Sequence, residues 1–452
     1  MHFLIMSIAG CAAIVAAGIR CQAAAPVTEV ARPDAACTQA VQPGHSPVIV
    51  YQDGRLILHT DLPPSAAHAT LGKMKRTLRF VEKHWRRRLR GSLECYVAED
   101  ASRWPDQAFP HPLARVWIEC IGGATVSEQA PASHAGRVKA TLYASTRPGA
   151  AAHEIVHAYC CQTFGQSGPD WYNEGLATVV GFGGRDGQGV QCPLEVLATL
   201  RQESPQTVRQ LVQHQPFTSA THDALAQMVA GRGSARGQVP ISCWTSADAE
   251  NLTAMRKAYD RSWSLCYLLL HDPNYQSQFR RLGTTYLTGH RPSYQQTFGA
   301  VHQELAFDYR AFMQHVDMGY RVDLCSWEWH KRFRPLEWNG SRSRTIKAAR
   351  GYQATGVEVV GGQRYHYAAQ GNWSMSSDAC STDANGATDG SGRLEAVVMH
   401  AYQLSEPFEL GTSGRFLAPV SGHLYVRCRD CWNQLADNRG TLKVTFSRVR
   451  GD

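Results

Sequence analysis

The chain has 452 residues, of which 43% are hydrophobic, and a formal net charge of +8. This length excludes a single typical domain, so we expect two or three, and the apolar content is sufficient for real hydrophobic cores. No long low-complexity tract is present, which excludes a chain without packed structure. The mild positive charge is compatible with anionic partners but identifies none of them.

An apolar run from Phe3 to Ile19 precedes a small-residue site at Ala23–Ala25. The run is short for a membrane span, so it predicts a secretory signal peptide over residues 1–25. Because no Lys or Arg precedes the run, an uncleaved anchor and a lipoprotein signal at Cys11 stay open as alternatives. We therefore expect a protein that is secreted or held in the periplasm or cell envelope, without membrane association beyond export. Residues 26–44 are rich in Pro and Ala and predict a linker.

Residues 45–325 are expected to form the first domain. Hydrophobic patterning predicts strands at Pro47–Tyr51 and Arg55–Thr60, and then a long helix from Ser65 to Leu89 with many Lys and Arg on its outer faces. A basic helix can bind nucleic acid, but no nucleic-acid fold motif accompanies this one, so we interpret it as a solvated surface and expect no nucleic-acid partner. Three further strands are predicted: Leu93–Glu99, Arg115–Glu119 and Val138–Ala144.

An H-E-x-x-H motif, formed by His153, Glu154 and His157, follows the last of these strands. The alanines before it favour a helix, and residues four apart on a helix lie on one face, so both imidazoles can point at one metal ion. Glu154 lies one position further round, where it can touch a water on that ion without being a ligand. The motif alone is weak, because an amphipathic helix with one buried and one exposed histidine has the same pattern.

A third metal ligand is offered by Glu174, within the segment Asp170–Ala177. Residues 164–169 contain Gly and Pro and predict a helix end and a turn. A second helix would therefore run back against the first and bring Glu174 to the two histidines. Catalytic zinc typically has three protein ligands and one open position, which this set would provide.

Together, H-E-x-x-H and W-x-N-E-G-L-A resemble the motifs of the gluzincin metallopeptidases, and most closely the peptidase-MA-like secreted branch. The resemblance implies a zincin-like fold with a mixed-sheet lobe and a helical lobe. It implies that His153, His157 and Glu174 bind Zn²⁺, and that Glu154 is the general base that deprotonates the zinc-bound water. It also implies a polypeptide substrate that pairs with the strand before the motif helix, at Ala140–Tyr143.

The chain after residue 177 is predicted to be mostly helical. The segment around Tyr259 resembles a helix that follows the zinc site in peptidase-MA-like proteins, and this phenol is our candidate for a catalytic donor to the oxyanion. The competing interpretation is a partly buried core tyrosine. Asp170 and Asn173 are candidates to orient a ligand histidine. The predicted helices are Pro193–Arg201, Thr207–Gln213, Leu252–Leu270, Tyr275–Tyr286 and 293–318.

Residues 326–343 are rich in Trp and Arg and predict a linker between domains. From residue 344 to residue 452, short alternating runs are separated by turns rich in Gly, Asp and Ser, which is typical of a β-sandwich. The predicted fold class is therefore α+β, with a zincin-like domain followed by an all-β sandwich.

Parts of this tail resemble the calcium-binding hairpin and fold of bacterial galactose-specific lectins of the PA-IL type. Three segments carry the resemblance: Gly371–Trp373, Gly422–Asp430 and Asp437–Val444. The resemblance implies a Ca²⁺ ion bound by the side-chain oxygens of Asp430, Asp437 and Asn438, and a carbohydrate or cell-surface glycan as partner. The loop at residues 382–392 lacks the His and Gln that contact galactose in those lectins. The competing interpretation is a hairpin whose Asp and Asn only satisfy turn backbone groups.

The chain has 14 cysteines, and 12 of them lie beyond the predicted signal peptide. An even number in an exported chain predicts disulfides, although spacing does not give their pairing. Cys428 and Cys431 form a C-x-x-C pair that fits a disulfide, a redox pair or half of a thiolate zinc site. Because no second C-x-x-C accompanies it, a disulfide is the favoured interpretation.

Three functions remain open on the sequence. The first is a secreted zinc metallopeptidase with a C-terminal carbohydrate- or surface-binding module. The second is a non-catalytic glycan-binding adhesion protein with a vestigial zinc site, and the third is a zinc hydrolase of a non-protein amide such as one in the cell wall. Glu154 favours catalysis, because a purely structural site has no use for a carboxylate beside an open metal position.

Overall fold

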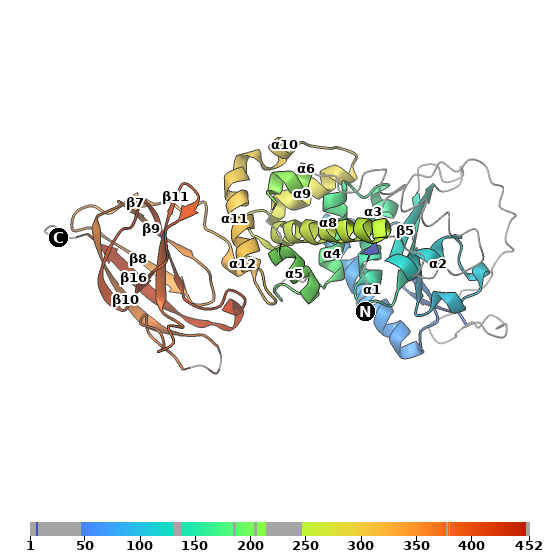
Figure 1. Ribbon diagram of the computed structural model, residues 1–452, viewed down its shortest axis with the longest axis horizontal. Coiled ribbons are helices and arrows are strands. Elements are labelled where there is room, and N and C mark those ends of the chain that lie inside the picture. The colour runs from blue at the N-terminus through green and yellow to red at the C-terminus, as the bar shows by residue number, and fades with distance from the viewer. Residues whose placement is uncertain are drawn as a thin grey trace. The chain divides into compact units, whose positions relative to one another are not determined.

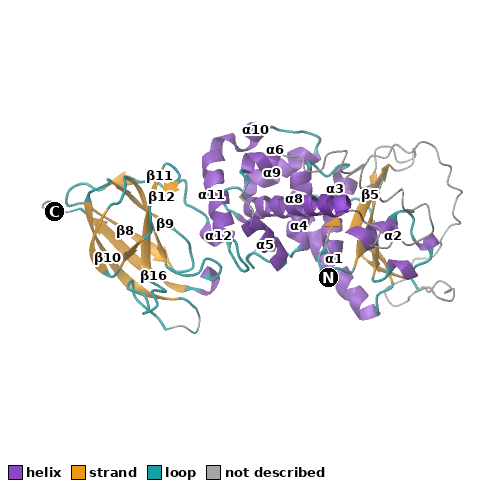
Figure 2. Ribbon diagram, in the orientation of Figure 1, coloured by secondary structure: helices purple, strands orange, loops and turns teal. Residues whose placement is uncertain are grey.

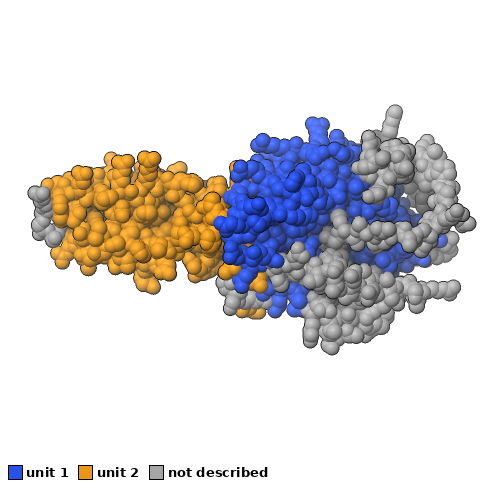
Figure 3. All heavy atoms as spheres, turned by 90° about the horizontal axis from the view of Figure 1, so that it is seen from above, with its two compact units in different colours: residues 1–183, 209–267, 278–297 blue, residues 184–208, 268–277, 298–452 orange. Residues whose placement is uncertain are grey.

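The structure is a computed structural model that describes residues 6–7, 47–129, 138–183, 187–202, 206–213, 246–376, 378 and 380–448. The predicted signal peptide and linker lie outside the described residues, apart from Met6–Ser7. The chain forms two compact units (Figure 3). Unit 1 comprises Met1–Gly183, Arg209–Tyr267 and Gln278–Thr297; unit 2 comprises Gly184–Val208, Leu268–Ser277 and Phe298–Asp452.

Unit 1 is built on a six-stranded mixed sheet (Figure 1). β3, β4 and β6 run parallel to one another, whereas β2 and β5 are antiparallel to their neighbours β3 and β6. β1 pairs with the start of β5. In spatial order the strands are β1 (Met6–Ser7), β5 (Gly122–Gln129), β6 (Val138–Ser145), β4 (Leu93–Ala98), β3 (Leu56–Thr60) and β2 (Ile49–Asp53).

Two helices of unit 1 pack against the sheet and each other. α1 (Pro64–Trp85) joins β3 to β4 and buries Leu71, Met74 and Leu78 at helical spacing, as predicted. α3 (Ala150–Phe164) follows β6 directly and packs against β5, β6 and α1. The indole of Trp85 at the end of α1 stacks on the Tyr159 ring of α3, with 5.5 Å between ring centroids.

The predicted strand at Arg115–Glu119 is wrong. The segment forms a short helix, α2 (Ala114–Val116), and one π-helical turn, η3 (Trp117–Ile121), before β5 begins at Gly122. Ala114 and Ile118 are both buried in a cluster with Trp104 and Tyr143, and this spacing of four residues is helical. Two 3₁₀ turns precede it, η1 (Ala101–Arg103) and η2 (Asp106–Ala108).

Between Ala177 and Cys325 the described residues are mostly helical, as predicted (Figure 2). The region expected as one helix over 293–318 is two helices separated by a 3₁₀ turn, η6 (Gly299–Val301). The helices from α4 onward are α4 (Asp170–Gly181), α5 (Leu194–Gln202), α6 (Val208–Gln213), α8 (Ser246–His271), α9 (Gln276–Leu287), α10 (Tyr294–Phe298), α11 (His302–His315) and α12 (Val322–Cys325).

Unit 2 contains the predicted β-sandwich. Its two sheets have the strand orders β14-β10-β16-β8 and β12-β11-β15-β9-β7, and β13 pairs with β11. Inward residues such as Ile346, Trp373, Val398 and Leu442 form one core between them. The strands are β7 (Arg334–Pro335), β8 (Ser341–Lys347), β9 (Gln353–Val359), β10 (Arg364–Ser374), β11 (Leu394–His400), β12 (Gln403–Leu404), β13 (Phe408–Leu410), β14 (Ser413–Leu417), β15 (Gly422–Cys428) and β16 (Arg439–Ser447).

The predicted fold class is therefore confirmed: a mixed α+β region is followed by a β-rich C-terminal region. None of the helices in the described ranges combines the length and the apolar character that a membrane span requires.

The favoured disulfide at the C-x-x-C pair is wrong, because Cys428 and Cys431 are both free thiols. The Cys428 side chain points into the sandwich core, where its sulfur lies 3.4 Å from the sulfur of Met375, while Cys431 is exposed in the following loop. Burial raises the pKa of the Cys428 thiol, so this sulfur behaves as an apolar core atom. Free thiols are also found at Cys95, Cys266, Cys325 and Cys380.

Close packing between α4 and α8 depends on Gly175. A Cβ atom at this position would lie 2.5 Å from the carbonyl oxygen of Ser262 and 2.6 Å from the Cys266 sulfur, both on α8. Real Cβ contacts are not that short, so any larger residue would push the two helices apart.

We predict that Gly175→Ala lowers the free energy of unfolding by about 1–3 kcal/mol, because the added methyl group overpacks this contact. The matched control is Gly72→Ala in α1, where the new Cβ would meet only an Arg76 nitrogen at 3.6 Å. That variant should be more stable by about 0.5–1 kcal/mol, because alanine is the better helix former. Urea denaturation of both variants checks this, and equal changes in the two would contradict it.

Candidate metal centre

The centre is formed by two consecutive helices that pack antiparallel. α3 ends at Gly165, and α4 begins at Asp170 after a short turn. At the other end of the pair, Gly149 has a φ of +87°, and a Cβ there would lie 2.5 Å from the carbonyl oxygen of Gly181. Only glycine permits this combination, so the first turn of α3 is held against the last turn of α4.

His153 and His157 on α3 and Glu174 on α4 point to one place. The Nε2 atoms of the two histidines lie 2.8 Å apart, and Glu174 Oε2 lies 3.3 Å from His153 Nε2 and 3.5 Å from His157 Nε2. All three side chains are buried. Among the described residues this is the one group of three His, Cys, Asp or Glu whose ligand atoms fall within 4.8 Å of one another.

Asn173 orients His157 from the side opposite the centre. Its Oδ1 lies 2.9 Å from His157 Nδ1, so the imidazole donates its Nδ1 proton there and turns the Nε2 lone pair toward Glu174 and His153. The amide Nδ2 of Asn173 donates to Glu174 Oε1 at 3.2 Å. One buried amide therefore holds two members of the group. No hydrogen bond joins Asp170, the other candidate for this role, to either histidine among the described contacts.

The electrostatics of the group favour a cation at its centre. Burial opposes charge on both His157 and Glu174, but their mutual attraction outweighs it, raising the pKa of His157 to about 9 and lowering the pKa of Glu174 to about 2. Glu174 Oε2 is buried and has no well-formed hydrogen bond to any described residue. Two imidazole nitrogens and a buried carboxylate oxygen thus converge, and a divalent metal ion fits that donor set.

Glu154 lies beside the group without joining it. The side chain is 1% exposed, and the Thr125 hydroxyl of β5 donates to its Oε2 at 2.8 Å. Close approach of β5 is possible because residue 123 is glycine: a Cβ atom on Gly123 would lie 3.2 Å from Glu154 Oε1. The strand therefore fixes the direction in which this carboxylate points.

Tyr259 on α8 lies beside the three candidate metal ligands. Its ring centroid lies 6.3 Å from that of His153. Burial, and next the negative charge of Glu174 with which it interacts, raise the pKa of the Tyr259 phenol well above its usual value. The phenol therefore stays protonated beside the group formed by His153, His157 and Glu174. This position agrees both with a catalytic donor and with a core tyrosine, because the side chain is buried and also adjacent to the predicted ligands.

The expected substrate-pairing strand is wrong. β6, which contains Ala140–Tyr143, is an interior strand, because Leu142 pairs with Thr125 of β5 on one side and with Cys95 of β4 on the other. The strand nearer the edge is β5, which β1 covers only at Gly122 and Gly123. The sequence analysis did not identify Thr125, because it placed the strand at Arg115–Glu119. The hydrogen bond between Thr125 and Glu154 joins distant parts of the chain and has no local sequence pattern.

The predicted calcium ligands lie in the connection between β15 and β16. These strands belong to different sheets and do not pair, so the expected hairpin is wrong. Asp430 follows β15, Asp437 ends the 3₁₀ turn η7 (Leu435–Asp437) and is exposed, and Asn438 precedes β16. Asp430 Oδ1 accepts a hydrogen bond from the backbone N–H of Cys431, and Asn438 Nδ2 donates to the Ala348 carbonyl. Asp430 Oδ2 and Asn438 Oδ1 are buried without a partner among the described residues.

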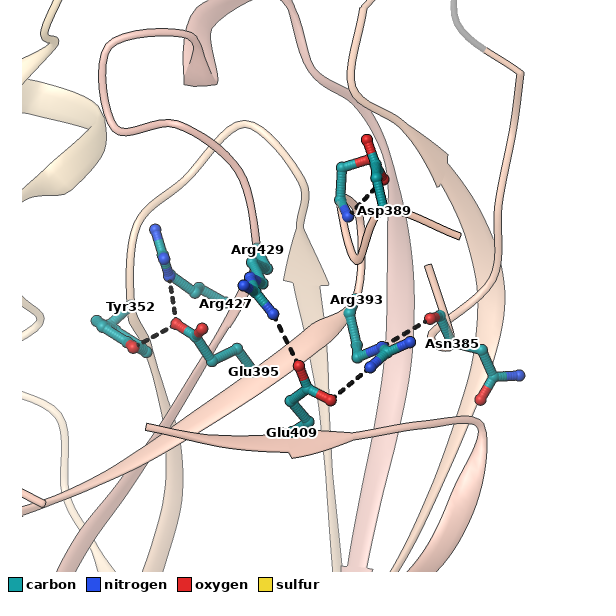
Figure 4. Close-up of polar contacts among 9 residues, drawn as sticks. Tyr352, Asn385, Asp389, Arg393, Glu395, Glu409, Arg427 and Arg429 are labelled. Carbon is teal, nitrogen blue, oxygen red and sulfur yellow. Dashed lines mark hydrogen bonds and ion pairs between the residues drawn. The ribbon is translucent and has the colours of Figure 1, made fainter. Parts of the chain in front are cut away.

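The loop at residues 382–392 is held by its own polar contacts. Arg393 at its end donates to the Asn385 carbonyl at 3.0 Å and to Glu409 of β13, which also accepts from Arg429 at 2.7 Å (Figure 4). Asp389 accepts from the backbone N–H and the hydroxyl of Ser391, and these hydrogen bonds lower its pKa.

No known protein family profile matches this chain, and no curated protein matches it either. A solved structure described as the EclA N-terminal domain, a PllA-like lectin, is similar to part of the chain. It is 23% identical, covers 25% of this chain and 97% of its own, and has a TM-score of 0.20.

We predict that Asn173→Ala weakens metal binding by about 10- to 100-fold, because the His157 imidazole loses the acceptor that orients it. Competition with a chromophoric chelator measures this. The matched control is Asn372→Ala, at an exposed position of β10. Equal affinities for Asn173→Ala and wild type would show that Asn173 does not position the ligand.

Proposed function

We propose that this protein is a secreted zinc-dependent hydrolase that cleaves peptide bonds. The observation that carries the proposal is the buried convergence of His153, His157 and Glu174 with a separate carboxylate, Glu154, beside it. A structural metal site has no use for that second carboxylate, whereas hydrolysis requires a general base.

Zinc is the proposed ion because two imidazoles and one carboxylate are a typical catalytic zinc set, supported here by the hydrogen bond from His157 to Asn173. When bound, zinc supplies Lewis acidity to the scissile carbonyl and lowers the pKa of a water molecule toward neutrality.

Glu154 is the proposed general base. Its carboxylate takes the proton of the attacking water and later passes it to the leaving amine. The hydrogen bond from the Thr125 hydroxyl holds Oε2, so the orientation of the carboxylate is set before substrate arrives. Tyr259 is the proposed donor to the oxyanion that develops on the carbonyl, and its raised pKa keeps the required proton in place.

The proposed substrate is an extended polypeptide that pairs with β5. Beyond Gly123, the outer side of this strand has no partner strand among the described residues. Backbone pairing there would place a peptide next to Thr125 and Glu154, and it would demand little of the substrate sequence.

Export and carbohydrate binding complete the proposal. Export is supported by the apolar run and small-residue site at the N-terminus, and the glycan partner by the resemblance of the hairpin segments to PA-IL-type lectins.

We predict that Glu154→Gln reduces hydrolysis of denatured casein by at least about 100-fold while zinc content is unchanged, because the amide removes the base but not a ligand. Glu99→Gln, at an exposed position, is the matched control. Cleavage of a bacterial cell-wall preparation and not of casein would instead support hydrolysis of a non-protein amide. Cleavage of neither by zinc-loaded wild type would remove the hydrolase proposal and leave the non-catalytic glycan-binding alternative.

A second candidate function is calcium binding at the β15–β16 connection. It is favoured by the two buried oxygens without partners among the described residues, Asp430 Oδ2 and Asn438 Oδ1, since a buried acceptor without a donor is costly. Carboxylate and amide oxygens are ligands that Ca²⁺ prefers, and Asp437 would supply another.

We predict that Ca²⁺ at about 100 times its dissociation constant stabilises the protein by about 2.7 kcal/mol, because it binds only the folded β15–β16 connection. The rise in melting temperature should disappear in Asp430→Ala and persist in Asp389→Ala, which changes an exposed carboxylate of the neighbouring loop. Thermal scans with Ca²⁺ and with Mg²⁺ measure it. An equal rise in both variants would contradict a site at Asp430.

A further inference from the structure

Unit 2 contains a cavity of about 310 Å³ that none of the functions above uses. Its walls come from α11, α12, the residues that follow α8, and loops and strands of the sandwich. Its lining includes Arg310 and seven aromatic residues: Phe307, Phe312, Tyr320, Trp327, Tyr352, Tyr402 and Trp432. A volume of this size holds a small organic molecule.

The aromatic rings brace one another around the cavity. The Trp327 indole meets the Phe307 ring edge-to-face at 5.0 Å and lies 5.5 Å from the Tyr352 ring. Tyr352 in turn lies 5.8 Å from Trp432. These four rings therefore form a continuous chain of aromatic contacts along the cavity wall.

Two carboxyl groups interrupt this aromatic lining. Asp272 is 1% exposed and Asp308 is 4% exposed, so both are almost completely removed from solvent. Asp308 Oδ2 accepts hydrogen bonds from the Tyr275 hydroxyl at 2.5 Å and from the Trp329 indole at 2.8 Å. Its other oxygen, Oδ1, is buried and has no hydrogen-bond partner among the described residues.

Among the described residues, no Lys or Arg forms a salt bridge with Asp272 or Asp308, although the positive charge of Arg350 partly offsets the effect of burial on Asp272. The guanidinium of the nearby Arg427 lies over the rings of Tyr352 and Trp432, 5.2 Å and 4.1 Å from their centroids. Its Nε donates to Glu395 Oε1 at 2.8 Å, the oxygen to which the Tyr352 hydroxyl also donates at 2.6 Å (Figure 4). Burial raises the pKa of Asp272 to about 7, and burial followed by the charge of Asp272 raises the pKa of Asp308 well above its ordinary value.

We propose that this cavity binds a small organic ammonium ion, with its charge against Asp308 Oδ1 and Asp272 and its carbon groups against the aromatic faces. Cations are attracted to the faces of Trp and Tyr rings, most strongly where water is excluded. The ion would also favour ionisation of the two carboxyl groups, which burial otherwise opposes. A neutral sugar would not favour that ionisation.

The proposal does not depend on the hydrolase assignment. His153, His157 and Glu174 lie in unit 1, whereas every residue that lines the cavity lies in unit 2. Its test is therefore a direct binding measurement on the full-length protein, without any assay of hydrolysis.

Isothermal titration with three probes tests the chemistry: 1,5-diaminopentane as a primary ammonium ion, choline as a quaternary one, and pentan-1-ol as a neutral molecule of similar length. At least one ammonium ion should bind wild type, and pentan-1-ol should not. Asp308→Asn should weaken that binding by about tenfold or more, because the amide keeps the acceptor for Tyr275 and Trp329 but cannot ionise when the ammonium ion binds.

Asp317→Asn is the matched control, since Asp317 forms an ion pair with Arg201 at 2.9 Å and does not line the cavity. It should bind the ammonium ion as wild type does. Asp272→Asn serves as a second variant if Asp308→Asn fails to fold, which the thermal unfolding midpoint shows, and it should also weaken binding. Undiminished binding by either folded cavity variant, or no binding of both ammonium ions by wild type, would overturn the proposal.

Discussion

The structure of unit 1 depends on bringing three ligand atoms from two helices to one buried point. His153, His157 and Glu174 converge there without a donor that satisfies them all, so a cation is the simplest way to stabilise the arrangement. The glycine contact between Gly149 and Gly181 holds the ends of these helices together. Antiparallel packing of α3 and α4 therefore stabilises the fold of unit 1 and also brings the three ligand atoms together.

Two elements distant in sequence from α3 and α4 contribute further polar side chains to the site. β5 places the Thr125 hydroxyl against Glu154, and α8 places Tyr259 beside the ligand group. Gly175 is adjacent to a proposed ligand and also allows α8 to approach α4, so one small residue connects helix packing with the position of Tyr259. The hydrolysis that we propose would require such support, because small displacements of a base or donor lower its effectiveness.

Unit 2 shows the same physical principle in different chemistry. Asp430 and Asn438 present buried oxygens in the β15–β16 connection, where we propose a hard cation, whereas Asp308 presents one at an aromatic cavity, where we propose an organic cation. In each case a buried oxygen has no hydrogen-bond donor among the described residues, and its surroundings indicate the kind of ligand. Native proteins rarely leave such atoms without partners.

The sequence by itself determined the features that depend on near neighbours: the helix bearing His153 and His157, the turn that brings Glu174 back to them, and the alternating strands of the sandwich. Periodicity and turn residues act over a few positions, which is why these predictions were confirmed. Only the tertiary structure decided that β5 rather than β6 lies near the sheet edge, that Cys428 is a core residue, and that Asp308 lies in an aromatic cavity. These features arise from contacts between distant segments, whose packing energies have no signature in local spacing.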